Sequence, residues 1–215
     1  MMNKKSKLYT IAILVCVFTV LGFNQKNSTA YGEDNLTKYL NEQSSEMSTM
    51  MENMKSIKPT GDVALDFLYG MIPHHKAAIE MSKSLLKYGG ENEQIKEIAE
   101  NIVKGQSEEI DQMKNMIKCI ESNPQIDEKK EQEYLKEYNK MFAKNMNEKD
   151  KSKINSVDKA FAIGMIKHHE MAITMAQDVL KYTNNQDIIN LANNIIKSQN
   201  SEIIKMKEFI NNTSK

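Results

Sequence analysis

Arginine and tryptophan are absent from this chain of 215 residues, and glycine (8), proline (3) and cysteine (2) are scarce. The 29 basic side chains are all lysines, and 29 acidic side chains balance them. Nucleic-acid binding needs a clustered positive field and arginine forks that read bases, so the composition argues against a nucleic-acid partner. With few glycines and prolines, long stretches of Lys, Glu, Asn, Ile, Met and Ala favour helix over sheet.

The first thirty residues have the parts of a secretory signal peptide: a basic start (4–7), an apolar stretch (8–23) and small residues before a cleavage site after Ala30. We interpret residues 1–30 as a removed signal peptide. The alternative is a retained anchor, through which alone the chain would meet a membrane. Both interpretations predict a secreted or extracytoplasmic protein of the cell envelope. After removal Cys119 is the one remaining cysteine, so stability must come from packing rather than from disulfides.

One sequence unit occurs twice in the chain. Residues 67–75 (FLYGMIPHH) match residues 161–169 (FAIGMIKHH), and the similarity continues into the second half of each unit. Each unit reads as a helix, a short polar turn and a second helix, and so short a turn makes the two helices antiparallel neighbours. The units span 62–121 and 156–212, and a crossover with a helical pattern of its own, 122–155, joins them.

A single helical hairpin cannot bury its own apolar face, so the two units should pack into one core. We therefore predict an all-α protein: a ferritin-like four-helix bundle of two duplicated antiparallel hairpins, plus an N-terminal helix and a crossover helix. The predicted domains are the signal peptide or anchor (1–30), a methionine-rich N-terminal helical segment (31–61) and the duplicated bundle (62–212).

All four histidines of the chain lie in the repeated motif. Imidazole is the commonest metal ligand in proteins, and helical bundles build metal sites from side chains that point inward from facing helices. Methionines before and after each histidine pair place thioether groups on the same helix face. The predicted metal ligands are Met71, His74, His75, Met81, Met165, His168, His169 and Met175. The alternative is that the histidines are hydrogen-bonded core residues and the methionines fill space.

Glutamine and glutamate recur at one spacing in the core stripe of both second helices, as Gln106-x-x-Glu109 and Gln199-x-x-Glu202. We expect the two glutamates either to accept hydrogen bonds from the histidines and so orient them, or to be ligands. The alternative is that they pair with lysines at the bundle ends. The supporting residues or additional ligands are Glu109, Glu202, Met113 and Met206. The Glu-x-x-His motif of di-iron bundles is missing, which argues against a ferroxidase or oxygenase.

Methionine is abundant, with 16 residues. One face of the predicted N-terminal helix carries four of them, as an auxiliary metal site or as a face that docks on the bundle: Met47, Met50, Met51 and Met54. Met113, Met116 and Cys119 follow one another at three-residue steps, and for them packing is the favoured interpretation. Thioether sulfur is a poor ligand for Mg²⁺ or Ca²⁺, whereas methionine with histidine suits Cu(I).

The string MIPHH with its flanking residues, over 67–81, and the string QxxEIxxM, over 106–113, closely resemble the domain-of-unknown-function 305 family. The resemblance covers roughly residues 62–120 and 155–212. It implies an exported, ferritin-like protein that often carries the unit twice and, for some members, copper binding and resistance through Met and His. Carried over to this chain, it implicates the same eight methionines and histidines. Lys167 departs from the motif, which has proline there.

Together these patterns predict a non-enzymatic, extracytoplasmic metal-binding protein that sequesters copper or transfers it, as Cu(I). Its expected partners are the metal ion and a metal-delivery protein. Two alternatives stay open: a site of histidine and glutamate for zinc or iron, and a helical cell-envelope interaction module that holds no metal.

Overall fold

The computed structural model describes residues 34–145 and 154–213, and this part of the chain contains six α-helices and no β-strand. The helices are α1 (Asn35–Lys55), α2 (Val63–Tyr88), α3 (Glu93–Glu121), α4 (Glu128–Asn145), α5 (Val157–Val179) and α6 (Gln186–Asn212). The predicted all-α bundle with an N-terminal and a crossover helix is confirmed. The predicted signal peptide lies outside the described residues. Among the helices that are described, none is both long and apolar enough to span a membrane.

The helices of the two hairpins begin at side chains that accept hydrogen bonds from their first free N–H groups. These capping residues are Asp62 for α2, Asn92 for α3, Ser156 for α5 and Asn185 for α6. The α2–α3 turn contains Gly90, whose φ of +77° is a left-handed conformation that favours glycine. Because both turns are short, α3 folds back along α2, and α6 folds back along α5.

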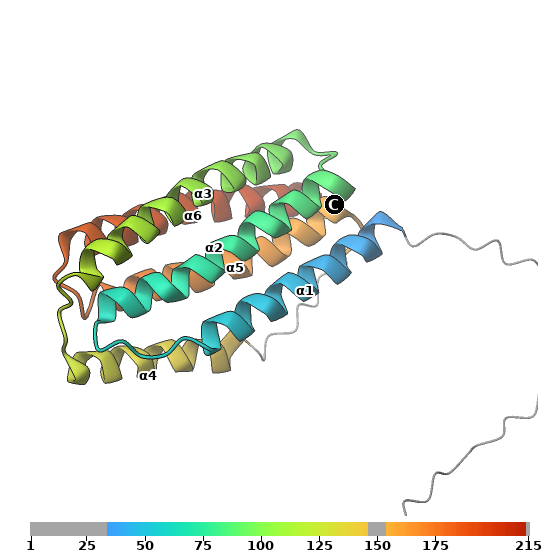
Figure 1. Ribbon diagram of the computed structural model, residues 1–215. Helices are drawn as coiled ribbons and strands as arrows, with labels where there is room; N and C mark the ends of the chain where they lie inside the picture. The colour runs from blue at the N-terminus through green and yellow to red at the C-terminus, as the bar shows by residue number, and fades with distance from the viewer. Residues whose placement is uncertain (1–33, 146–153, 214–215) are drawn as a thin grey trace, which may run out of the picture. The chain divides into compact units, whose positions relative to one another are not determined.

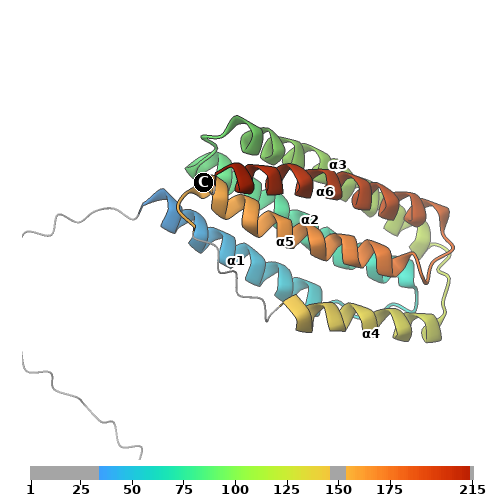
Figure 2. The same cartoon turned by 180° about the vertical axis from the view of Figure 1, so that it is seen from behind.

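The two hairpins pack with α2 beside α5 and α3 beside α6. One face of the α2–α5 layer contacts α3 and α6, and the other face is covered by α1 and α4 (Figures 1 and 2). α2 and α5 run in opposite directions, so the start of α5 lies at the end of α2. There the N–H of Asn92 donates to Oδ1 of Asp158 at 3.1 Å. Helices on both faces bury α2 and α5 almost all round, which is why their sequences are apolar on most sides.

The two covering helices occupy equivalent places on the two halves of the bundle. Gln43 of α1 packs against Gly164 of α5, and Tyr138 of α4 packs against Gly70 of α2, the matched position of the repeat. Four residues before these contacts each covering helix carries a fully buried tyrosine, Tyr39 and Tyr134 respectively. In three dimensions the repeated unit therefore contains three helices, and the covering helices share the string Tyr-Leu-x-Glu at residues 39–42 and 134–137.

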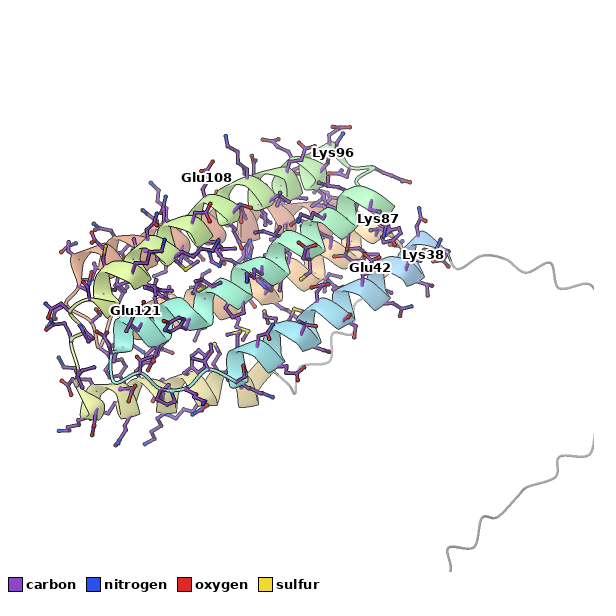
Figure 3. The ribbon with its side chains drawn as sticks, in the orientation of Figure 1. Lys38, Glu42, Lys87, Lys96, Glu108 and Glu121 are labelled. Carbon is purple, nitrogen blue, oxygen red and sulfur yellow. The ribbon has the colours of Figure 1, made fainter. Side chains whose placement is uncertain are left out.

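The carboxylate of Glu42 joins α1 to the end of α2 through three hydrogen bonds. Glu42 accepts hydrogen bonds from Ser84 at 2.6 Å, Tyr88 at 2.6 Å and Lys87 at 2.9 Å. Figure 3 shows Glu42 on α1 and Lys87 on α2 near the same end of the bundle. These hydrogen bonds, that of Ser84 first, lower the pKa of Glu42 to about 2.

The start of α4 is held against the start of α2 through Gly61, whose φ is +86°. Its N–H donates to Glu131 Oε1, and its carbonyl accepts from the N–H of Asp127 at 2.9 Å. Beside it, Oδ1 of Asp66 accepts hydrogen bonds from the N–H and hydroxyl of Thr60 at 3.0 and 2.8 Å. Burial, together with the neighbouring Glu131, raises the pKa of Asp66 to about 7.

Because folding raises the pKa of Asp66 from 3.8 to about 7, the folded protein holds a proton between these pH values that the unfolded chain releases. The contribution of Asp66 to the free energy of unfolding therefore falls as pH rises through this window. We expect the Tm of Asp66→Asn to rise relative to that of the wild type between about pH 4 and pH 7. Thermal melts followed by circular dichroism test this, and a Tm difference that does not change with pH would contradict it.

The two matched glycines should respond differently to alanine. A Cβ on Gly70 would lie 2.9 Å from the Tyr138 hydroxyl and 3.2 Å from the terminal methyl of Met175. The atoms nearest to a Cβ on Gly164 belong to the side chain of Gln43, whose flexible end would have to move aside. Overpacking should make Gly70→Ala destabilising by about 1–3 kcal/mol. Gly164→Ala, which gains up to about 1 kcal/mol of helix propensity, should be close to neutral. Urea unfolding measures both, and equal losses would contradict the packing described.

Candidate metal centre

Four histidines meet in the middle of the α2–α5 pair, and none has any solvent exposure: His74, His75, His168 and His169. The rings of His74 and His168 face each other across the two helices, with centroids 3.7 Å apart and planes inclined by 43°. Within each sequence pair the centroids are 6.3 and 6.1 Å apart. The antiparallel packing of the repeats thus joins their motifs into one histidine layer, with an inner pair (His74, His168) and an outer pair (His75, His169).

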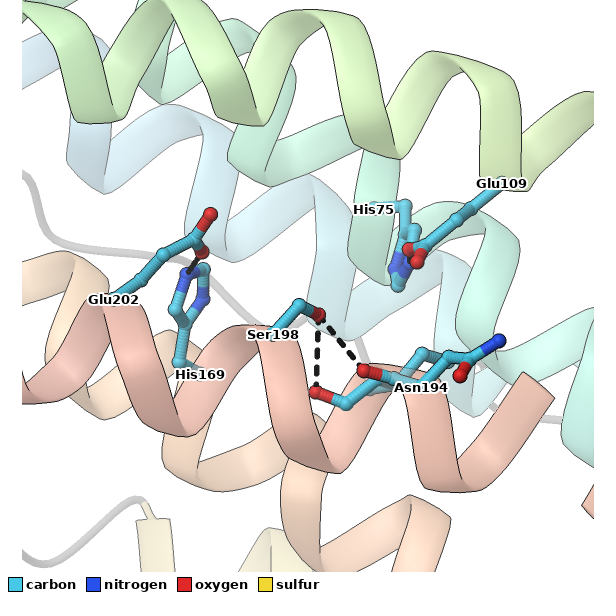
Figure 4. A network of polar contacts seen from close by, with 7 residues as sticks. His75, Glu109, His169, Asn194, Ser198 and Glu202 are labelled. Carbon is cyan, nitrogen blue, oxygen red and sulfur yellow. Dashed lines mark hydrogen bonds and ion pairs between the residues drawn. The ribbon is translucent and has the colours of Figure 1, made fainter. Parts of the chain in front are cut away.

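The outer histidines are each bound by a glutamate of the neighbouring layer. Nε2 of His75 lies 2.7 Å from Oε2 of Glu109 on α3, and Nε2 of His169 lies 2.6 Å from Oε2 of Glu202 on α6 (Figure 4). A carboxylate only accepts hydrogen bonds, so Nε2 is the donor, and in a neutral ring Nδ1 then carries the lone pair. Both Nδ1 atoms are buried and have no hydrogen-bond partner. The arrangement is that of carboxylates that orient imidazole ligands.

The inner histidines lack even this partner. Both ring nitrogens of His74 and both of His168 are buried without a hydrogen bond. Burial, and then the charge of neighbouring imidazoles, lowers the pKa of both rings well below 6.5. Each ring is therefore neutral and has one nitrogen lone pair available. Leaving such polar groups unpaired in an apolar interior costs stability, typically about 1–3 kcal/mol for each group.

Buried methionines form two groups, one on each side of the histidine layer. The first sulfur set consists of Met71, Met113 and Met175, and the second of Met81, Met165 and Met206. All six side chains are at most 1% exposed. Each set draws on both repeats, so Met71 and Met81 of one motif lie in different clusters. Met165 and Met175 are separated in the same way.

The helix register explains this division. His75 lies opposite Glu109 on an antiparallel helix, so Met71, four residues before His75, faces Met113, four residues after Glu109. The second repeat places Met165 opposite Met206 by the same spacing from the His169–Glu202 contact. Successive turns rise about 5.4 Å, so each sulfur set begins about one helical turn from the histidine layer.

Two further residues at this level were not among the predicted ligands. Gln106 and Gln199 are 5% and 2% exposed, and both amide atoms of each have no hydrogen-bond partner. Gln199 lies on the side of the first sulfur set and Gln106 on the side of the second, since each is three residues before its glutamate. The repeated Gln-x-x-Glu spacing was the sequence signal that could have found them.

Of the four methionines on the predicted face of α1, two are buried and two are half-buried. Met50 and Met54 are buried in the same cluster as the first sulfur set, while Met47 and Met51 are half-buried. On α3, Met113 is buried and Cys119 is exposed, so these two do not share one environment.

No group of three or more His, Cys, Asp and Glu side chains is placed to hold a metal ion within residues 34–145 and 154–213. The buried donors around the histidine layer include the unpartnered imidazole nitrogens, the two glutamine amides and, about a turn away, the thioethers of the two sulfur sets. This donor set fits a soft ion that prefers sulfur and imidazole, and it fits Mg²⁺ or Ca²⁺ poorly.

The sequence matches the family described as Domain of unknown function (DUF305) twice, over residues 22–117 and 66–210. These matches confirm the family resemblance that the repeated histidine motif indicates. Uncharacterized protein L153 of Acanthamoeba polyphaga mimivirus is 43% identical over 53 residues, which make up 25% of this chain and 35% of that protein. The chain therefore spans about a third of the length of this curated relative.

Among solved structures, CopM in a silver-bound form is 27% identical, with 71% of this chain and 98% of CopM covered at a TM-score of 0.54. CopM in a Cu(II)-bound form is 26% identical, with 69% and 96% covered at 0.53. A DUF305 fragment from Deinococcus radiodurans, 20% identical, shares the fold, with 72% and 99% covered at 0.51.

The burial of the inner histidines gives a direct spectroscopic prediction. Because burial lowers their pKa values, we expect His74 and His168 to remain neutral through the range around pH 6.5 in which an exposed imidazole becomes protonated. Ring ¹⁵N chemical shifts measured across this range distinguish neutral from protonated rings. If either inner ring titrated near pH 6.5 in the folded protein, the described burial would be incorrect.

Proposed function

The chain belongs to the DUF305 family, and we propose that it is a copper-binding protein that holds Cu(I) inside its helical bundle. One observation carries the proposal: four fully buried histidines have six ring nitrogens without a hydrogen-bond partner, with buried thioethers on either side. An interior of this kind is unfavourable when empty and becomes favourable when a cation takes up the lone pairs. The structures of CopM with silver and Cu(II) support the choice of metal.

The chemistry of the donors favours the reduced ion. Cu(I) and Ag(I) are soft ions that accept thioether and neutral imidazole, and such ligands need no compensating negative charge in an apolar interior. The inner histidines offer this form because burial lowers their pKa. Glu109 and Glu202 act in this proposal by holding the outer rings with Nδ1 free, rather than as ligands. We expect the affinity to fall as the pH drops, because protons compete for the same nitrogens.

The proposed role is sequestration of copper or its transfer to a delivery partner, by exchange of one Met or His ligand for another. Export, proposed from the N-terminal residues 1–30, would place this activity in the cell envelope. A zinc or iron site would instead use the carboxylates as ligands, but both are already hydrogen-bonded to a histidine ring. A bundle that binds no metal is the remaining alternative, and it predicts that copper leaves the Tm unchanged.

The test is a competition titration of residues 31–215 with Cu(I) against a chromophoric chelator. We compare the wild type with His74→Leu/His168→Leu, which removes the inner imidazoles, and with Met71→Leu/Met165→Leu, which removes sulfur at nearly constant volume. Each double variant should bind at least about tenfold more weakly. Met141→Leu, a buried methionine of α4 outside both sulfur sets, is the matched control and should bind normally. Wild-type affinity in both double variants would refute the proposal.

The same histidine variant also tests how far the unpaired imidazoles lower the stability of the metal-free protein. Leucine removes four buried ring nitrogens that have no hydrogen-bond partner while it keeps an apolar side chain at each position. We therefore expect His74→Leu/His168→Leu to melt at a temperature equal to or higher than the metal-free wild type. Addition of Cu(I) should raise the Tm of the wild type by more than that of the variant, which binds the ion more weakly. A strongly destabilised variant would show that the imidazoles serve packing.

A further inference from the structure

The six methionines of the two sulfur sets and the four histidines are almost completely shielded from solvent. An ion can therefore reach them only through a passage between helices, and the proposed function requires one. A suitable cavity lies between the covering helices α1 and α4 and the start of α2. Its volume is 160 Å³, and its rim carries the exposed residues Lys55, Pro59 and Asn139.

The inner lining of this cavity combines a soft donor with oxygen donors. Met54 on α1 contributes a thioether and is 1% exposed, and Asp66 on α2 contributes a carboxylate and is 3% exposed. Oδ2 of Asp66 and the hydroxyls of Tyr134 and Tyr138 are buried without a hydrogen-bond partner. These unpaired oxygens are what a cation would satisfy. Burial and the neighbouring Glu131 raise the pKa of Asp66 to about 7, so a cation bound here would replace a proton on this carboxyl group.

The side chain of Tyr138 extends from the cavity lining toward the first sulfur set. Tyr138 lines the cavity, and its hydroxyl lies 2.9 Å from the position that a Cβ on Gly70 would take. The terminal methyl of Met175 lies 3.2 Å from the same point. Tyr138 and Met175 therefore meet at the bare Cα of Gly70, one helical turn from His74. At the matched position of the other half, Gly164 is covered by the side chain of Gln43.

We propose that this cavity is a transient binding site for soft monovalent metal ions, where Met54 and Asp66 receive Cu(I) before it passes Tyr138 to the first sulfur set. This inference rests on the proposed function and adds the path that the ion takes. It assigns Asp66 a role that the histidine motif does not suggest. The ammonium of Lys55, held over the Phe142 ring at 5.8 Å from its centroid, places a positive charge at the rim that slows the approach of a cation.

The experiment measures the rate of Cu(I) uptake separately from the affinity. Cu(I) is supplied as its cationic acetonitrile complex. Stopped-flow ultraviolet absorbance follows its uptake by the protein, and excess bicinchoninate measures its release. Met54→Leu/Asp66→Asn should slow both uptake and release by about tenfold, as expected when a charged and coordinating first contact is removed. The equilibrium affinity should stay within about twofold, because a transit site changes both rates equally. Lys55→Gln should accelerate uptake, most clearly at low ionic strength.

Met141→Leu is again the matched control, since Met141 lies outside the cavity lining and should leave both rates unchanged. Met54→Leu alone, which keeps Asp66, guards against misfolding of the double variant, and circular dichroism verifies the fold of each. Wild-type uptake rates in folded Met54→Leu and in the double variant would overturn the route while leaving copper binding intact. A loss of affinity through faster release alone would also overturn it, because Met54 would then be a ligand of the final site. A wild type that takes up no Cu(I) would instead refute the proposed function.

Discussion

Six imidazole nitrogens buried without a hydrogen-bond partner are the constraint around which this protein is organised. An apolar core does not hold such groups without cost, and two buried glutamine amides add to that cost. Apolar packing by the surrounding helices offsets this cost. Because α2 and α5 have neighbouring helices on both faces, the histidine layer lies inside a core to which all six helices contribute apolar side chains. The carboxylates that hold the outer rings compensate part of this cost.

The antiparallel duplication gives the layer its chemistry. Facing motifs bring His74 and His168 into ring contact, and the same register places methionines of both repeats on each side. Neither repeat alone could complete such a set, because each repeat supplies two methionines to one set and one methionine to the other. A centre built in this way forms only when both halves are folded and packed, which couples the proposed metal binding to the stability of the whole bundle.

The two halves are not identical where the covering helices meet the core. Gln43 fills the space over Gly164, whereas Tyr138 lies over Gly70 beside a cavity that contains an unpaired carboxylate oxygen. The segment from Thr60 to Asp66, tied to α4 through Glu131, forms part of this difference. Two internally similar sulfur sets therefore have different surroundings, and in our proposal this asymmetry decides from which side an ion is loaded.

Much of the architecture followed from the sequence alone. Apolar spacing, two short turns and a repeated histidine motif determined six helices, two antiparallel hairpins and a shared core, because these features depend on local periodicity and on the need to bury one face of each helix. The pairing of His75 with Glu109 and of His169 with Glu202 was also among the expected outcomes. Only the tertiary structure decided that Met71 and Met81 lie in different clusters, that Gln106 and Gln199 are buried without partners, and that Asp66 lines a cavity. These facts depend on the direction and register in which one helix packs against another, and contacts between helices distant in sequence set both.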